Sequence, residues 1–156
     1  MKILICDDER DSAAQLKSLC LNFLEKAGIS HTAQLSCIND ASMIEAKEPD
    51  ILFLDIEMPG RDGLSAKDAL CEKDGKPLII FVTSHREAMP KAFGRNVVNF
   101  ITKPATQFLI DASLETAINL LPRDISICLE EKVSRRRKKA CKAAYDAYGK
   151  RMARLV

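Results

Sequence analysis

The sequence of 156 residues lacks any long run of apolar residues. A membrane-spanning helix needs about 20 consecutive apolar residues, and no stretch approaches that length. The apolar start of the chain meets Asp7 and Asp8 too early to form a secretory signal peptide. We therefore expect a cytoplasmic protein with no membrane partner.

The cysteines also lack the spacing of a zinc site or of a Cys-x-x-Cys redox motif. Several of them fall in segments with the pattern of helix or strand interiors, so we expect reduced, mostly buried thiols. The six are Cys6, Cys20, Cys37, Cys71, Cys128 and Cys141.

Apolar residues make up 47% of the chain and charged residues 29%, the balance of a folded globular protein. The net charge of +2 is unevenly distributed. Residues 123–156 contain 11 basic and 4 acidic residues, a net charge of +7, whereas residues 1–122 contain 13 basic and 18 acidic residues, a net charge of −5. We therefore predict one domain over residues 1–122 and a basic segment over residues 123–156.

Short, near-continuous apolar runs in the first 122 residues predict strands buried on both faces of a parallel sheet. These runs, with one weaker candidate at 31–36, are residues 3–6, 51–54, 78–82 and 97–101. No internal repeat is present.

Segments with helical periodicity separate the strands. The clearest has apolar residues at i, i+3, i+4 and i+7 from Leu16 to Ala27 and ends at Gly28. Five βα units in a row, joined by right-handed crossovers, predict an α/β fold: a doubly wound parallel sheet with helices on both faces. The remaining predicted helices are 39–47, 63–72 after an Asp62 cap, 85–93, and 106–121 before Pro122.

Polar residues follow the predicted strands: Asp7 and Asp8, Asp55, Thr83, and Lys103. Ligands of open α/β sheets bind at this edge, so we expect these side chains to converge. Clustered carboxylates repel unless a cation joins them, and Mg²⁺ suits carboxylates that face a phosphoryl donor. An aspartate can accept a phosphoryl group while a lysine and a hydroxyl hold its oxygens.

Each of these residues alone has an ordinary structural explanation. Asp7 and Asp8 would cap a helix, Asp55 would serve in a turn, Thr83 would cap another helix, and Lys103 would be a solvated lysine. Their occurrence together at the ends of four strands favours the functional interpretation.

The strand-end residues belong to four motifs: Cys6–Glu9, Leu54–Leu64, Phe81–Ser84 and Phe100–Pro104. Together these motifs resemble the receiver domain of bacterial two-component response regulators, the CheY-like family. This resemblance covers residues 1–122 and implies a flavodoxin-like sheet of strand order 2-1-3-4-5. It also implies a phosphoacceptor that catalyses only its own phosphotransfer and dephosphorylation, and is otherwise not an enzyme.

The resemblance implies a role for each matched residue. Asp55 is the phosphoacceptor, and Lys103 contacts the phosphoryl group. Asp8, Asp55 and the backbone carbonyl of Glu57 bind Mg²⁺ directly, and Asp7 binds it through water.

Thr83 resembles the switch hydroxyl of the family, and Phe100 resembles the aromatic residue that changes rotamer with it, although an aromatic in a strand is equally a core residue. The Lys103–Pro104 bond is expected to be cis, as is usual in the family. Glu57, Ser84 and His85 match positions where, in the family, side chains can control access of the attacking water. We hypothesise that they set the phosphoryl lifetime.

The implied partner is a sensor histidine kinase, and the implied output is transcription. A homodimer through the face of the fourth helix, fifth strand and last helix is a further expectation. Two alternatives stay open: a single-domain receiver that acts by protein–protein interaction, and a Mg²⁺-dependent phosphohydrolase, which would need a substrate pocket.

Residues 51–60 and 99–104 are similar to receivers that precede a LytTR DNA-binding domain. Too few residues follow position 129 for such a β-rich domain, so we expect the output domain to be truncated or absent. Three interpretations of the basic segment stay open. It is a solvated, partly disordered tail, a frameshift product, or a helix over 140–155. Such a helix would bind DNA phosphates or the acidic receiver of a partner. Its candidate nucleic-acid contacts are Arg135, Arg136, Arg137, Lys138 and Lys139.

Overall fold

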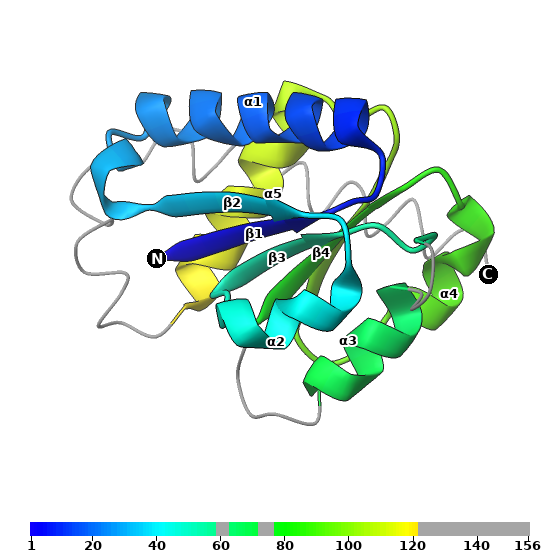
Figure 1. Cartoon of the computed structure of the whole chain (residues 1–156). Coiled ribbons are helices and arrows are strands. Elements are labelled where there is room, and N and C mark those ends of the chain that lie inside the picture. The colour runs from blue at the N-terminus through cyan, green and yellow to red at the C-terminus, as the bar shows by residue number, and fades with distance from the viewer. Residues whose placement is uncertain (59–62, 72–76, 122–156) are drawn as a thin grey trace.

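Five parallel strands form one sheet in the computed structural model, which describes residues 1–58, 63–71 and 77–121. The strand order is β2-β1-β3-β4-β5, which confirms the flavodoxin-like sheet (Figure 1). The strands are β1 (Lys2–Cys6), β2 (Gln34–Ile38), β3 (Ile51–Leu54), β4 (Leu78–Thr83) and β5 (Val97–Thr102).

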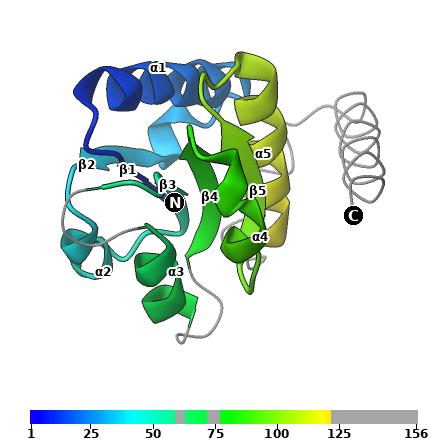
Figure 2. The ribbon, with the colours of Figure 1, turned by 90° about the vertical axis from the view of Figure 1, so that its right-hand side faces the viewer.

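Helices cover both faces of this sheet. Helices α1 and α5 lie on one face, and α2, α3 and α4 lie on the other (Figure 2). None of the helices in the described part of the chain is long and apolar enough to cross a membrane. The helices are α1 (Arg10–Lys26), α2 (Ile44–Lys47), α3 (Gly63–Cys71), α4 (Met89–Ala92) and α5 (Gln107–Leu120).

The central strands send alternate side chains into two separate cores. In β3, Phe53 packs beneath α1 and α5, whereas Leu52 and Leu54 pack against the opposite helices. All four residues of β3 are buried, because helices cover both of its faces. This burial holds the carboxyl ends of β1, β3, β4 and β5 in fixed positions at one edge of the sheet.

Three predicted elements differ from the structure. The strand predicted at 31–36 begins at Gln34, because residues Ser30–Thr32 form a 3-10 turn. The helix predicted at 39–47 is a 3-10 turn followed by the four residues of α2, which ends where Glu48 adopts a left-handed conformation (φ 47°). The helix predicted at 85–93 is likewise a 3-10 turn, Arg86–Ala88, followed by α4.

Other predictions agree more closely. Helix α1 ends before Gly28, whose φ of 68° is unstrained only for glycine. Cys6 and Cys20 are buried free thiols, as expected, whereas the free thiol Cys37 is exposed on the edge strand β2. Asp62, Glu72, Pro122 and Cys128 and Cys141 lie outside the described residues, so the domain boundary at 122 stays a prediction.

Gly63, the first residue of α3, lies close to the backbone at the end of β3. Its amide donates to the carbonyl of Ile56 at 2.8 Å, and a Cβ at this position would collide with the backbone carbonyl of Asp55. We expect Gly63→Ala to lower the free energy of unfolding by about 1–3 kcal/mol in chemical denaturation. Gly94→Ala is the control, since its Cβ would lie 3.5 Å from the flexible end of Lys67. Equal effects of the two substitutions would contradict this prediction.

Candidate functional site

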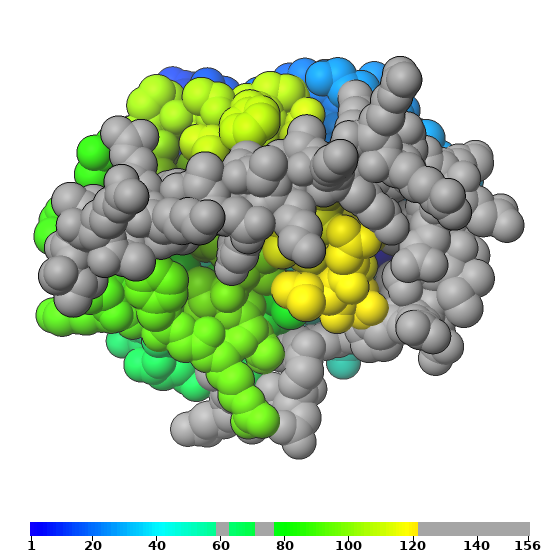
Figure 3. Space-filling view, turned by 180° about the vertical axis from the view of Figure 1, so that it is seen from behind, coloured from blue at the N-terminus to red at the C-terminus, as the bar shows by residue number. Residues whose placement is uncertain are grey.

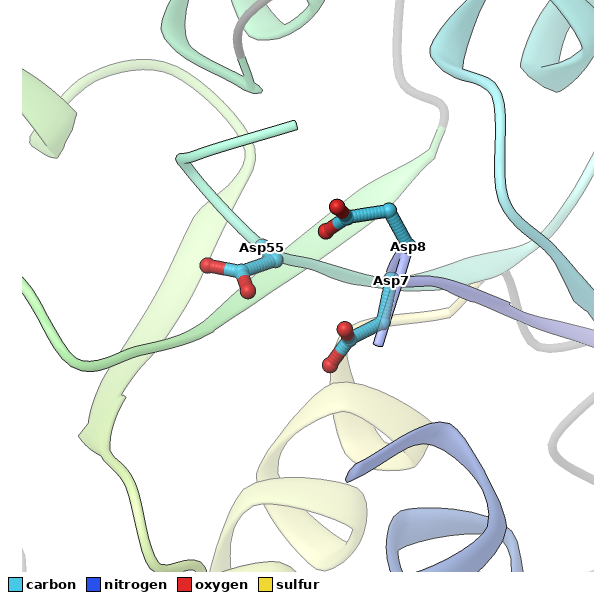
Figure 4. Close-up of side chains that lie close together, drawn as sticks. All are labelled: Asp7, Asp8 and Asp55. Carbon is cyan, nitrogen blue, oxygen red and sulfur yellow. The ribbon is translucent and has the colours of Figure 1, made fainter. Parts of the chain in front are cut away.

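Three carboxylates meet at the carboxyl edge of the sheet. Asp7 and Asp8 follow β1, and Asp55 follows β3, so neighbouring strands place them side by side (Figure 4). One oxygen of each lies within 4.8 Å of the others. Asp7 and Asp55 are buried, whereas Asp8 is exposed. Carboxylate oxygens at this separation are ligands that a hard divalent cation such as Mg²⁺ prefers.

Lys103, which follows β5, neutralises part of this negative charge. Its ammonium donates to Oδ2 of Asp55 at 2.6 Å and lies 2.9 Å from Oδ2 of Asp7. Burial alone would lower the pKa of Lys103, but the two carboxylates outweigh it and raise the pKa above its usual value. The lysine therefore stays charged. The peptide bond from Lys103 to Pro104 is cis, as the resemblance implied.

Asp7 makes contacts in two directions. Its Oδ1 accepts from the amide of Glu9 at 2.9 Å and its Oδ2 accepts from the hydroxyl of Ser12 at 2.6 Å, at the start of α1. Asp7 does not cap α1, whose N-cap residue is Glu9, but the same side chain faces Lys103. Its role at a metal site stays a prediction. Sequence reasoning missed Ser12; its place in the first turn after an Asp-Asp pair is the only signal for it.

The remaining oxygen of Asp55 is held by the backbone. Its Oδ1 accepts from the amide of Ile56 at 2.6 Å, and the amide of Asp55 donates to the carbonyl of Cys6 at 3.0 Å. Both carboxylate oxygens therefore have a donor, and the side chain has a defined orientation.

Thr83 lies at the end of β4 and is fully buried. Its hydroxyl oxygen accepts from the amide of His85 at 3.3 Å, and its carbonyl accepts from the amide of Lys103 at 2.9 Å. The backbone of the lysine is thus tied to the strand that carries the predicted switch hydroxyl.

His85 joins the loops that follow β3 and β4. Its Nε2 lies 2.8 Å from Oε2 of Glu57, and its Nδ1 lies 2.7 Å from Oε1 of Glu87. The hydrogen bond with Glu87 and the charge of Glu57 raise the pKa of His85. The sequence pointed to Glu57 and His85 but not to Glu87, which carries no motif.

Phe100 is buried in the core beneath α2, α3 and α4. Its ring centroid lies 6.1 Å from that of Phe81, its neighbour in the register of β4 and β5. The core interpretation of this residue is thus correct, and its role in a switch stays a prediction. The candidate nucleic-acid contacts at 135–139 lie outside the described residues.

A pocket of about 380 Å³ adjoins the carboxylates. Glu9 and Ser12 of the α1 region line one side, and Ser84 and Lys103 line the other. Asp55 is not among the lining residues, so the pocket lies beside the predicted phosphoacceptor and does not surround it.

Comparison with known proteins identifies the family. The model of the response regulator receiver domain matches residues 3–115, most of the chain. This chain belongs to the receiver domain family. Its sheet order and the convergence of its strand-end residues are those implied by the resemblance.

Curated relatives are regulators. The receiver is 35% identical over 104 residues to the positive alginate biosynthesis regulatory protein of Pseudomonas aeruginosa, covering 67% of this chain and 42% of that protein. It is 31% identical to the sensory transduction protein LytR of Streptococcus agalactiae, covering 73% of this chain and 46% of the relative. The chain thus spans less than half the length of these relatives.

A solved structure agrees with this assignment. The response regulatory domain of mrkE from Klebsiella pneumoniae has a TM-score of 0.62 and 25% sequence identity, covering 76% of this chain and 96% of that one. The signal receiver domain of merR from Colwellia psychrerythraea, at 17% identity and a TM-score of 0.65, shows the same fold over 76% of this chain and 98% of its own.

The ion pairs of Lys103 offer a test of the site's electrostatics. Lys103→Met leaves Asp7 and Asp55 buried without their cation, so we expect it to lower the free energy of unfolding by about 3 kcal/mol without added metal. Lys2→Met is the matched control, because Lys2 pairs with Glu48 at 3.7 Å with both side chains exposed, and should cost less than about 1 kcal/mol. Urea denaturation measures both; equal losses would show that the buried pairs contribute no more than an exposed one.

Proposed function

We propose that this receiver accepts a phosphoryl group on Asp55 from a sensor histidine kinase and changes conformation as a result. The observation that carries the proposal is the position of Asp55: a buried carboxylate, bonded to Lys103, within 4.8 Å of the oxygens of Asp7 and Asp8. One edge of the sheet therefore holds a nucleophile, Asp55, a cation for the transferred group, Lys103, and an acidic cluster suited to a metal ion.

Mg²⁺ fits the donor set, because all of its candidate ligands are oxygens and the cluster carries three negative charges against one lysine. Asp8, Asp55 and the backbone carbonyl of Glu57 would hold it, and Asp7 would bind it through water. When bound, the ion neutralises negative charge that develops on the transferred phosphoryl group.

The chain's own residues account for the rest of the transfer. A carboxylate oxygen of Asp55 attacks phosphorus, and the bond from phosphorus to the donor nitrogen breaks. Lys103, already 2.6 Å from Asp55, moves its hydrogen bond to a phosphoryl oxygen. The hydroxyl of Thr83 then leaves the amide of His85 and donates to another phosphoryl oxygen, which is the switch.

A phosphohydrolase is the weaker candidate. The pocket beside the site could hold a small substrate, but Asp55 does not line it. Members of the receiver family are generally not classed as enzymes, and we propose that this chain performs only its own phosphorylation and dephosphorylation. Turnover of small phosphomonoesters in a phosphatase assay would favour the other candidate.

The output proposed here is control of transcription in the cytoplasm. The relatives are regulators, and their additional length is available for an output domain. A homodimer through α4, β5 and α5, or contacts from Arg135 to Lys139 to DNA phosphates, would connect the switch to that output. A single-domain receiver that acts through protein contacts remains the alternative, and a salt-dependent DNA gel shift separates the two.

Phosphorylation is tested by intact-mass spectrometry after incubation with acetyl phosphate. We expect a single phosphoryl adduct on the wild type that requires Mg²⁺, and no adduct on Asp55→Asn. Asp111→Asn, in α5, is the control and should behave as the wild type. An unmodified wild type, even with a cognate kinase, would leave a receiver fold used only for binding.

The contact between Glu57 and His85 predicts coupled effects on dephosphorylation. We expect Glu57→Ala and His85→Ala each to change the rate at which the phosphoryl group is lost. The double substitution should change it by less than the product of the two single effects, because the residues are in contact. Decay of the adduct after removal of the donor measures the rates. Unchanged rates in both single variants would remove these residues from the mechanism.

A further inference from the structure

The pocket beside the predicted phosphoacceptor has a place in the proposed transfer. Its volume of about 380 Å³ is in the range of small-molecule sites. Helix α1 forms one wall, and residues at the ends of β4 and β5 form the other. Lys103 belongs to this second wall, and its ammonium is also 2.6 Å from Oδ2 of Asp55. One side chain therefore separates the pocket from the nucleophile.

The position of the pocket fits the part of a phosphoryl donor that departs. In-line transfer puts the nucleophile and the departing group on opposite sides of phosphorus. A group that leaves as Asp55 attacks must occupy space that Asp55 does not touch, beside the lysine that holds the phosphoryl oxygens. The pocket meets both conditions, because Lys103 lines it and Asp55 does not.

The walls of this pocket are acidic. The described residues that line it include two carboxylates, Glu9 and Asp11, and one base, Lys103. This ammonium is already paired, at 2.6 Å from Asp55 and 2.9 Å from Asp7. Oε2 of Glu9 lies 3.6 Å from the same ammonium. The charge of the lysine is thus shared among three carboxylates, and the pocket keeps a net negative charge.

This charge distinguishes two classes of phosphoryl donor. In phosphoramidate, the nitrogen on phosphorus is protonated and positively charged. It leaves as ammonia when a carboxylate oxygen of Asp55 forms the new bond to phosphorus. In acetyl phosphate, the acyl oxygen keeps the electron pair of the broken bond, and acetate leaves as an anion. Negative walls stabilise the positive nitrogen and oppose the charge that develops on acetate.

We propose that the pocket receives the departing group of the phosphoryl donor, and that Glu9 and Asp11 select donors with a phosphorus–nitrogen bond over acyl phosphates. This inference rests on the function proposed for Asp55 and names the chemical class of its donor. The two carboxylates determine specificity, and they take no part in forming the bond to phosphorus.

Second-order rate constants for phosphorylation by the two donors test this inference. Intact-mass spectrometry of the full chain measures them, with saturating Mg²⁺ and at constant ionic strength. The readout is the rate constant with phosphoramidate divided by that with acetyl phosphate. Both donors transfer the same group, so an effect of a substitution on metal binding, on Lys103 or on stability cancels in this ratio.

Glu9→Gln and Asp11→Asn should each lower the ratio about threefold, the effect of one unit charge about 6 Å away at the dielectric constant of water. The double variant should lower it about tenfold. At about 1 M salt the screening length falls to about 3 Å, so the variants and the wild type should then differ less.

Glu25→Gln is the matched control, because it removes the same charge from the same helix. Helix α1 runs across the molecule in Figure 1, and Figure 3 shows it from behind, in blue along the upper edge. Glu25 lies near the end of α1, about 21 Å along the helix from Asp11. Its substitution should leave the ratio unchanged.

Two results would overturn the inference alone. One is an unchanged ratio in both Glu9→Gln and Asp11→Asn. The other is an equal fall in Glu25→Gln, which would assign the effect to the net charge of the chain. Either result leaves the phosphorylation of Asp55 standing, because both donors still give the adduct. A wild type that takes a phosphoryl group from neither donor would instead overturn the function proposed for Asp55, and this inference with it.

Discussion

The contact of Lys103 with Asp55 and Asp7 is the interaction on which the arrangement of the site depends. It brings together the ends of β1, β3 and β5, and Asp55 and Lys103 are 48 residues apart in the sequence. Three carboxylates this close would repel one another, and a single lysine compensates only part of their charge. The edge of the sheet is therefore left with a net negative charge that favours a divalent cation. The two hydrophobic cores stabilise the fold against the repulsion between these carboxylates.

The buried strands hold these charged side chains in fixed positions. Because β3 is covered on both faces, the backbone at its end is held in place, and hydrogen bonds with Cys6 and Ile56 orient Asp55. Thr83 and Lys103 are joined through a backbone hydrogen bond, so a change at the hydroxyl of Thr83 acts on a strand pair that also contains Phe81 and Phe100. In the proposed switch, this packing of β4 against β5 is the path from the site to the face formed by α4, β5 and α5.

The sequence predicted the parts of the structure that follow from burial. Runs such as 51–54 are continuously apolar because helices cover both faces of the strand. The polar residues that follow parallel strands lie at the same edge of the sheet. It failed where local hydrogen bonds decide the conformation. Asp40 accepts from the amide of Ser42 and begins a 3-10 turn, and Glu48 adopts a left-handed conformation that ends α2 after four residues. Neither feature produces a pattern of apolar residues that could be recognised in the sequence. The local contact of His85 with Glu87, two residues further along the chain, was likewise not predicted.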